Sequence, residues 1–178
     1  MELLKKPGVR FGLISAMVYA IGLVLVRFAG IEAFTSWPKA FPWLIMLAIA
    51  FVACVKQLAI NGGRLPFPKA MVIILTVMVL TEASAALTEW LIYQVDTELP
   101  ARMKEVKLSR TAASFEQFDG IIDYAEGDRE EIMSEVENAN YNFSAGNAVL
   151  KFVTWIIIDF LFALLLAAIV RKEPKPVE

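Results

Sequence analysis

Two carboxylates, Glu82 and Asp159, are the residues of this chain best placed to do chemistry, because each stands inside a long apolar run. Ionisable side chains in such runs are costly in a membrane and usually face the interior of a helix bundle. Counted along helices from the run ends at Ala70 and Val170, Glu82 lies about 18 Å deep and Asp159 about 16 Å deep. We therefore expect both to point into the bundle at similar depth.

Two interpretations of this pair remain open. If Glu82 and Asp159 face each other, both cannot ionise, so a proton is retained or a cation bridges them. In the structural interpretation, protonated carboxyls bond to nearby hydroxyls and hold the helices together. In the functional interpretation, the pair supports proton- or cation-linked transport or sensing.

A second polar pair is expected at the outer end of the spans. Glu89 follows Glu82 by two helical turns and lies on the same stripe. Arg27 closes another apolar run at the same interface. This placement predicts an ion pair between Arg27 and Glu89.

The composition excludes several kinds of active site. The 178 residues include no histidine, the commonest general base and metal ligand, so Ser-His-Asp and Cys-His mechanisms are ruled out. The one cysteine, Cys54, stands in an apolar run and is expected to be a small core residue. Gly62 and Gly63 are too short a motif for a phosphate loop. We expect no catalytic residue, no metal site and no cofactor.

Apolar residues make up 58% of the chain and the mean hydropathy is +0.59, concentrated in four runs long enough to cross a bilayer. These predicted spans are 9–28, 41–60, 70–93 and 152–170. The first is interpreted as a retained anchor, because Arg27 stands where a signal-peptide cleavage site would begin. Small residues at Gly12, Ala16 and Ala20 predict close helix packing. The predicted fold class is all-α: one integral membrane domain over 1–178, a four-helix transmembrane bundle with a helical extramembrane insertion between spans three and four.

Charge predicts the orientation. With four spans, both termini and the loop between spans two and three share one face, and basic residues gather there: Lys5, Lys6, Arg10, Arg64, Lys69, Arg171, Lys172 and Lys175. The opposite face receives Glu32, Lys39 and the segment 94–151, which has 12 Asp and Glu against 6 Lys and Arg, a net of −6. By the positive-inside rule, both termini are cytoplasmic and 94–151 is exported.

The exported segment 94–151 is predicted to be helical. Pro100 suits a first turn with Thr97 as a cap, and Asp128 with Glu131 resembles a capping box that starts a second helix. The predicted apolar positions are Leu99, Met103, Val106, Phe115, Phe118, Ile122, Tyr124, Ile132 and Val136, with breaks at Gly120 and Gly127. The acidic residues Asp119, Asp123, Glu126 and Asp128 lack the spacing of an EF-hand calcium loop. The segment is either a hairpin that extends spans three and four and packs on itself, or a docking surface for a partner or ligand.

The order of features resembles a known family. A Gly-Gly turn within 61–70 links two spans, the next span ends near Tyr93, Pro100 opens the helical segment, and Arg171 and Lys172 close the last span. This order is similar to the bacterial domain-of-unknown-function family 4199, small four-span inner-membrane proteins. The resemblance covers about residues 5 to 172 and implies the bacterial inner membrane. That family has no assigned reaction, so it implies no functional residues.

Three functions are weighed. The leading hypothesis is a non-enzymatic interaction or assembly subunit, with a homo-oligomer or another membrane protein as partner in the lipid bilayer. The alternative is a proton- or cation-linked transporter or sensor using Glu82 and Asp159. An enzyme ranks third, because no nucleotide or metal motif is found. The net charge of −2 and a pI near 5.3 argue against a nucleic-acid partner.

Overall fold

The computed structural model describes residues 5–36, 40–118 and 126–172. Within those ranges the chain is helical: α1 Pro7–Ala29, α2 Ile31–Ser36, α3 Ala40–Ile60, α4 Phe67–Val95, α5 Leu99–Phe118, α6 Glu126–Asn138 and α7 Ala145–Val170. The predicted all-α class is confirmed. Several positions named in the sequence analysis lie outside the described residues: Lys39, Asp119, Gly120, Ile122, Asp123, Tyr124 and Lys175.

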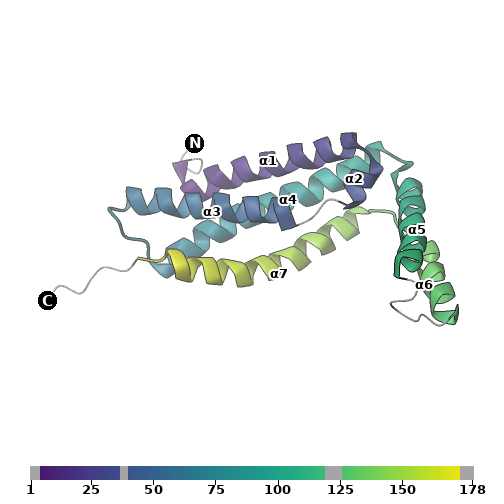
Figure 1. The fold of residues 1–178 in the computed structure, drawn as a ribbon. Helices are drawn as coiled ribbons and strands as arrows, with labels where there is room; N and C mark the ends of the chain where they lie inside the picture. The colour runs from purple at the N-terminus through teal and green to yellow at the C-terminus, as the bar shows by residue number, and fades with distance from the viewer. Residues whose placement is uncertain (1–4, 37–39, 119–125, 173–178) are drawn as a thin grey trace.

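Four long helices, α1, α3, α4 and α7, lie side by side and form the bundle (Figure 1). Each is long and apolar enough to cross a membrane. α4 and α7 run beyond the predicted spans 70–93 and 152–170, with 29 and 26 residues. The difference is largest at the start of α7, because its first turns are polar. There Ser144 caps the helix by accepting a hydrogen bond from the backbone nitrogen of Asn147 at 3.2 Å.

α3 ends in the Gly-Gly turn that the sequence predicted. Gly62 and Gly63 have φ of +63° and +85°, which glycine adopts without a steric penalty. The Gly62 nitrogen donates to the carbonyl of Ala59 at 3.2 Å and the Gly63 nitrogen to the carbonyl of Leu58 at 2.9 Å. These two bonds form a Schellman motif, which satisfies the last carbonyls of α3 and reverses the chain toward α4.

α1 packs closely on α4 through small residues. A Cβ at Gly12 would lie 3.2 Å from the Cα of Val77, so glycine allows this approach without displacing either helix. Ser84 donates from its hydroxyl to the carbonyl of Ala16 at 3.1 Å across the same contact. Gly12 and Ala16 are buried as predicted, whereas Ala20 is only half-buried.

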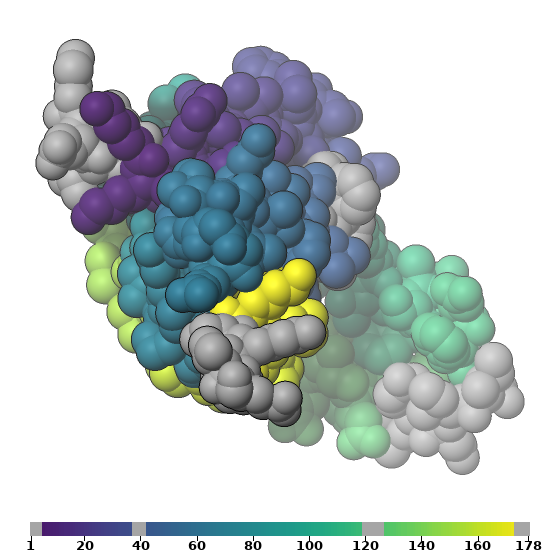
Figure 2. Space-filling model, turned by 90° about the vertical axis from the view of Figure 1, so that its left-hand side faces the viewer, coloured from purple at the N-terminus to yellow at the C-terminus, as the bar shows by residue number. Residues whose placement is uncertain are grey.

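One end of the bundle, here called the loop end, carries the turn between α3 and α4, the start of α1 and the end of α7 (Figure 1). Leu65 and Lys172 exchange two backbone hydrogen bonds of 2.9 Å, and Figure 2 shows the end of α7 in yellow beside the blue turn. Above this bridge lies the apolar core: Met46, Ala50, Ala53, Cys54, Leu65, Ala70, Ile74, Val77, Met78, Ala163 and Ala167. Cys54 is a buried core residue, as expected.

The opposite end, here called the hairpin end, carries α5 and α6. These helices pack on each other, and the Nζ of Lys104 lies 3.9 Å from a carboxylate oxygen of Glu137. Figure 1 shows that they lie crosswise at the end of the bundle and project past α7. The expectation that the segment prolongs spans three and four is therefore wrong. The chain turns at Asp96, where α4 ends, instead of continuing the axis of α4.

Candidate functional site

The predicted site residue Asp159 lies buried between α7 and α3. Its side chain is fully buried. The indole Nε1 of Trp43 donates a hydrogen bond to its Oδ1 at 3.1 Å, and Phe162 packs edge-on against the Trp43 ring with centroids 4.3 Å apart. The other oxygen, Oδ2, has no hydrogen-bond partner in the part of the chain that the structure describes. Among the described residues, the indole of Trp43 is thus the hydrogen-bond partner of this carboxyl group.

The second predicted residue, Glu82, is buried on α4 but lines a cavity of about 480 Å³ toward the hairpin end. Among the described residues, no hydrogen bond joins Glu82 to Asp159. Trp43, which bonds Asp159, also lines this cavity. Both carboxylates are inside the bundle, as predicted, but only Glu82 faces open space.

Aromatic and charged side chains share the cavity wall. The aromatic residues come from four helices, α1, α2, α3 and α7: Tyr19, Phe34, Trp43, Trp155 and Phe162. The charged residues are Glu82, Glu89, Lys107 and Lys151. A concave site that is mostly apolar with a few polar groups is typical of small-molecule binding sites.

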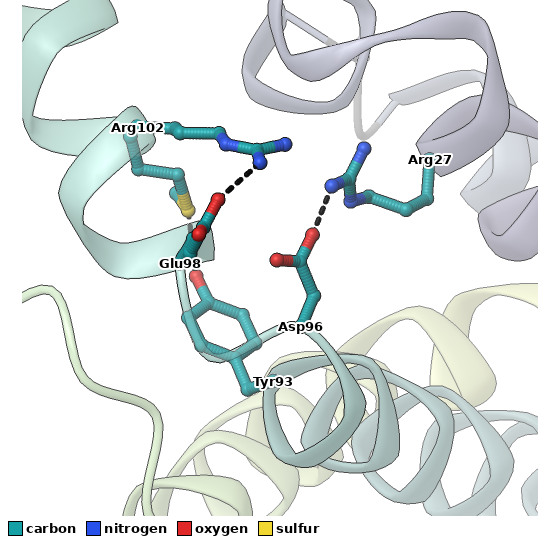
Figure 3. A network of polar contacts seen from close by, with 6 residues as sticks. Arg27, Tyr93, Asp96, Glu98 and Arg102 are labelled. Atoms are coloured by element: carbon teal, nitrogen blue, oxygen red, sulfur yellow. Dashed lines mark hydrogen bonds and ion pairs between the residues drawn. The ribbon is translucent and has the colours of Figure 1, made fainter.

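The predicted ion pair between Arg27 and Glu89 is wrong. Glu89 pairs with Lys151 on α7, and both side chains are mostly buried. Arg27 pairs with Asp96, as Figure 3 shows. The physical reason is helix length: α4 continues to Val95, which carries Asp96 to the end of α1, and α7 begins early enough to place Lys151 beside Glu89.

Arg27 and Asp96 lie outside the apolar stretch, at the ends of their helices. The hydrogen bond from the Arg27 guanidinium, with its positive charge, holds the pKa of Asp96 below the ordinary value of 3.8. Asp96 is therefore ionised at neutral pH. Nearby, Arg102 pairs with Glu98 one turn away in sequence, in a contact that is far more exposed (Figure 3).

Helix α5 closes over the cavity. Met103 and Lys107 of α5 line it, and the hydroxyl of Tyr93 donates to the sulfur of Met103 at 2.8 Å. Lys107 also lies over the ring of Tyr141, with its Nζ 5.1 Å from the centroid. Arg110 donates to the Ser36 hydroxyl at 2.6 Å, which ties α5 to α2. The hairpin is thus attached directly above the cavity.

A smaller apolar groove of about 160 Å³ lies between α1 and α3. Gly22, Val18, Pro42 and Ile45 contribute to its lining. It shares Tyr19 and Leu23 with the larger cavity, so the two spaces adjoin.

Sequence reasoning missed Lys151, Trp155 and Trp43. Lys151 was assigned to the exported segment. The sequence around Trp155 is apolar on all sides, so it does not indicate which face of that helix points into the bundle. A signal was present: Lys151, Trp155, Ile158 and Phe162 recur at helical spacing, and all four line the cavity. It becomes visible only once α7 is known to begin at Ala145.

A family model described as protein of unknown function (DUF4199) matches residues 10–172. No curated protein and no solved structure matches the chain.

Proposed function

The chain belongs to the DUF4199 family of proteins of unknown function, and we propose that it is a non-enzymatic membrane sensor that binds a ligand in the cavity beneath the hairpin. The observation that supports this most is that the charged residues lining the cavity come from both the spans and the hairpin. Glu82 comes from α4, Lys151 from α7 and Lys107 from α5. A ligand in this cavity would contact both the spans and the hairpin. Ligand binding would therefore shift the equilibrium position of the hairpin relative to the spans.

Packing favours binding over conduction by a single copy. Between the level of Glu82 and the loop end, Ile74 and Met78 are almost fully buried. The buried hydroxyls of Thr81 and Ser15 on this side of Glu82 bond to each other at 2.8 Å, so the described core here is packed closed and mainly apolar. The cavity is thus better suited to receiving a ligand from the hairpin end than to passing it across.

Charge suggests the side from which the ligand comes. Arg64, Lys69, Arg171 and Lys172 surround the loop end, whereas the segment that contains the hairpin is acidic. By the positive-inside rule, the loop end and both termini are cytoplasmic and the hairpin is exported. With the bacterial inner membrane as the proposed location, the ligand would arrive from outside that membrane.

Cysteine labelling tests the access route. In a Cys54→Ser background, Ala85→Cys places a thiol on the cavity wall, and Ala163→Cys places one in the packed core. A membrane-impermeant thiosulfonate should label Ala85→Cys only from the hairpin side and should leave Ala163→Cys unlabelled. Labelling of Ala85→Cys from the loop side alone, or from neither side of the folded protein, would overturn the proposal.

The sensing step needs a second measurement. Filling the cavity with a bulky reagent on Ala85→Cys should increase amide hydrogen exchange in α5, because Met103 and Lys107 lose their contacts. α6, on the far side of the hairpin, serves as the internal reference. Unchanged exchange in α5 would remove the sensing role.

A second candidate function is the interaction or assembly subunit. It is favoured by the hairpin, which projects beyond the outline of the bundle (Figure 2). Phe118, at the end of α5, is exposed. A photo-crosslinking residue at Phe118 should capture one partner in native membranes, and the same residue at Glu135 on α6 is the control. Capture of a second copy supports a homo-oligomer, and no specific capture from Phe118 contradicts this role.

A further inference from the structure

We infer that the ligand is a single-chain amphiphile with a cationic head, with its ammonium group beside Glu82 and its tail in the groove between α1 and α3. This inference rests on the proposed function above. It assigns a chemical class to the ligand and a separate site to each end of the molecule.

The charge of the head follows from how the cavity's ionised groups are paired. Glu89 and Lys151 neutralise each other, and Lys107 lies exposed at the mouth over Tyr141. Glu82 has no hydrogen bond to any residue that the structure describes. A carboxyl group that is more than nine-tenths buried and faces open space keeps its proton when alone, because an unpaired buried charge is costly. A cation beside it stabilises the ionised form, so Glu82 can bind a positively charged head by releasing that proton.

The aromatic wall favours an ammonium over a bare metal ion. Tyr19, Trp43 and Trp155 surround the same space as Glu82, and aromatic faces bind organic ammonium groups through cation–π attraction. Glu82 lies two helical turns below Glu89, about 10 Å deeper, so the head must pass the Glu89–Lys151 pair. A cavity of about 480 Å³ is large enough for a small organic molecule.

The groove between α1 and α3 is suited to bind the alkyl tail of the ligand. It is apolar, and it adjoins the cavity at Tyr19 and Leu23. A molecule with its head at Glu82 can therefore place an alkyl chain between α1 and α3. A Cβ built at Gly22 meets no atom within 4 Å, so the helix tolerates a larger residue there and the groove can be filled by substitution.

The experiment measures stoichiometric binding to the full chain in lipid nanodiscs by native mass spectrometry and calorimetry. The probes are decyltrimethylammonium, tetramethylammonium, decanol and decyl sulfate, all below micelle-forming concentrations. Decyltrimethylammonium should bind one to one and at least tenfold more tightly than each of the others. Glu82→Gln and Gly22→Leu should each weaken it at least tenfold, whereas Val72→Leu, at an exposed position that lines neither space, should not.

The variants separate the two ends of the ligand. Gly22→Leu should leave the weak binding of tetramethylammonium unchanged, because that cation has no tail. Glu82→Asp, which keeps the charge, should retain part of the affinity and controls for misfolding of Glu82→Gln. Thermal unfolding of each variant without ligand identifies any that fold poorly, and Gly22→Leu then carries the test alone.

Two failures are distinguishable. One-to-one binding of decanol or decyl sulfate that is insensitive to Glu82→Gln would overturn the cationic class and leave the binding function intact. Stoichiometric binding of none of the probes to the folded wild type would overturn both. A co-purified ethanolamine lipid that decyltrimethylammonium displaces would overturn the single-chain assignment in favour of a membrane lipid.

Discussion

Trp43 donates a hydrogen bond of 3.1 Å from its indole nitrogen to Oδ1 of Asp159, and this bond joins α3 to α7 inside the bundle. α3 and α7 otherwise share few contacts, since both pack mainly on other helices. The bond fixes the indole between the buried carboxyl and the cavity that Glu82 lines. Asp159 therefore orients part of the cavity wall without facing the cavity itself.

The first prediction concerns this bond. Trp43→Phe keeps an aromatic ring but leaves Asp159 without its donor, so the variant should lose about 1–3 kcal/mol of stability. Thermal unfolding in detergent measures the loss. In an Asp159→Leu background, the same substitution should have a much smaller effect. Equal losses in the two backgrounds would show that the bond contributes nothing.

The second prediction compares two glycines of α1. A Cβ at Gly12 would lie 2.7 Å from Cδ1 of Leu80 and 3.2 Å from the Cα of Val77. The Leu80 side chain can rotate, but the backbone of α4 cannot yield without moving α1. Gly12→Ala should therefore destabilise the protein by about 1–3 kcal/mol.

Gly22 is the matched control, because it lies on the same helix and a Cβ there meets nothing within 4 Å. Gly22→Ala should leave stability unchanged or raise it by up to about 1 kcal/mol, since alanine favours helix more than glycine. Equal unfolding temperatures for the two alanine variants would contradict the close packing of α1 on α4.

The third prediction is that Glu89 and Lys151 stabilise each other. Their side chains are 18% and 28% exposed, so solvent screens the pair only in part. Glu89→Gln and Lys151→Met should each reduce the unfolding temperature, with a coupling of about 1–2 kcal/mol in the double-mutant cycle. The exchanged pair Glu89→Lys with Lys151→Glu should recover part of the loss. Strict additivity would mean that the pair forms without stabilising the fold.

The sequence predicted the four spans and the Gly-Gly turn because those features are local. A run of about 20 apolar residues has few alternatives to a membrane helix, and two glycines after such a run match a Schellman ending. The small residues Gly12 and Ala16 likewise indicated which side of α1 packs.

The partners of Arg27 and Glu89 could not be predicted in the same way. Hydropathy marks where a run becomes polar, whereas a helix ends where its capping bonds form. α4 continues to Val95 and α7 begins at Ala145, which changes the level of Asp96 and Lys151. The cavity could not be predicted from the sequence for a further reason. Its wall depends on how α3 and α7 are rotated about their axes, and the uniformly apolar runs around Trp43 and Trp155 do not specify that rotation.

The last prediction is a pH dependence at the hairpin end. The Arg27 guanidinium holds the pKa of Asp96 below 3.8 in the folded protein. As pH falls, the unfolded chain therefore binds a proton at Asp96 before the folded protein does. The stabilisation by this pair is fully present above about pH 3.8 and is lost as pH falls through the folded-state pKa. Asp96→Asn should reduce stability by up to about 1 kcal/mol at neutral pH, as is usual for a pair near the surface.

Thermal unfolding of wild type and Asp96→Asn between pH 7 and pH 3 measures this effect. The difference in unfolding temperature should stay constant down to about pH 5 and shrink below pH 3.8, because only the wild type loses an ionised partner for Arg27. Glu98→Gln is the control, since the exposed pair of Glu98 with Arg102 lies beside Asp96 (Figure 3) and should contribute little at any pH. A difference that persists unchanged at pH 3, or one that Glu98→Gln reproduces, would show that Arg27 does not stabilise the ionised form of Asp96.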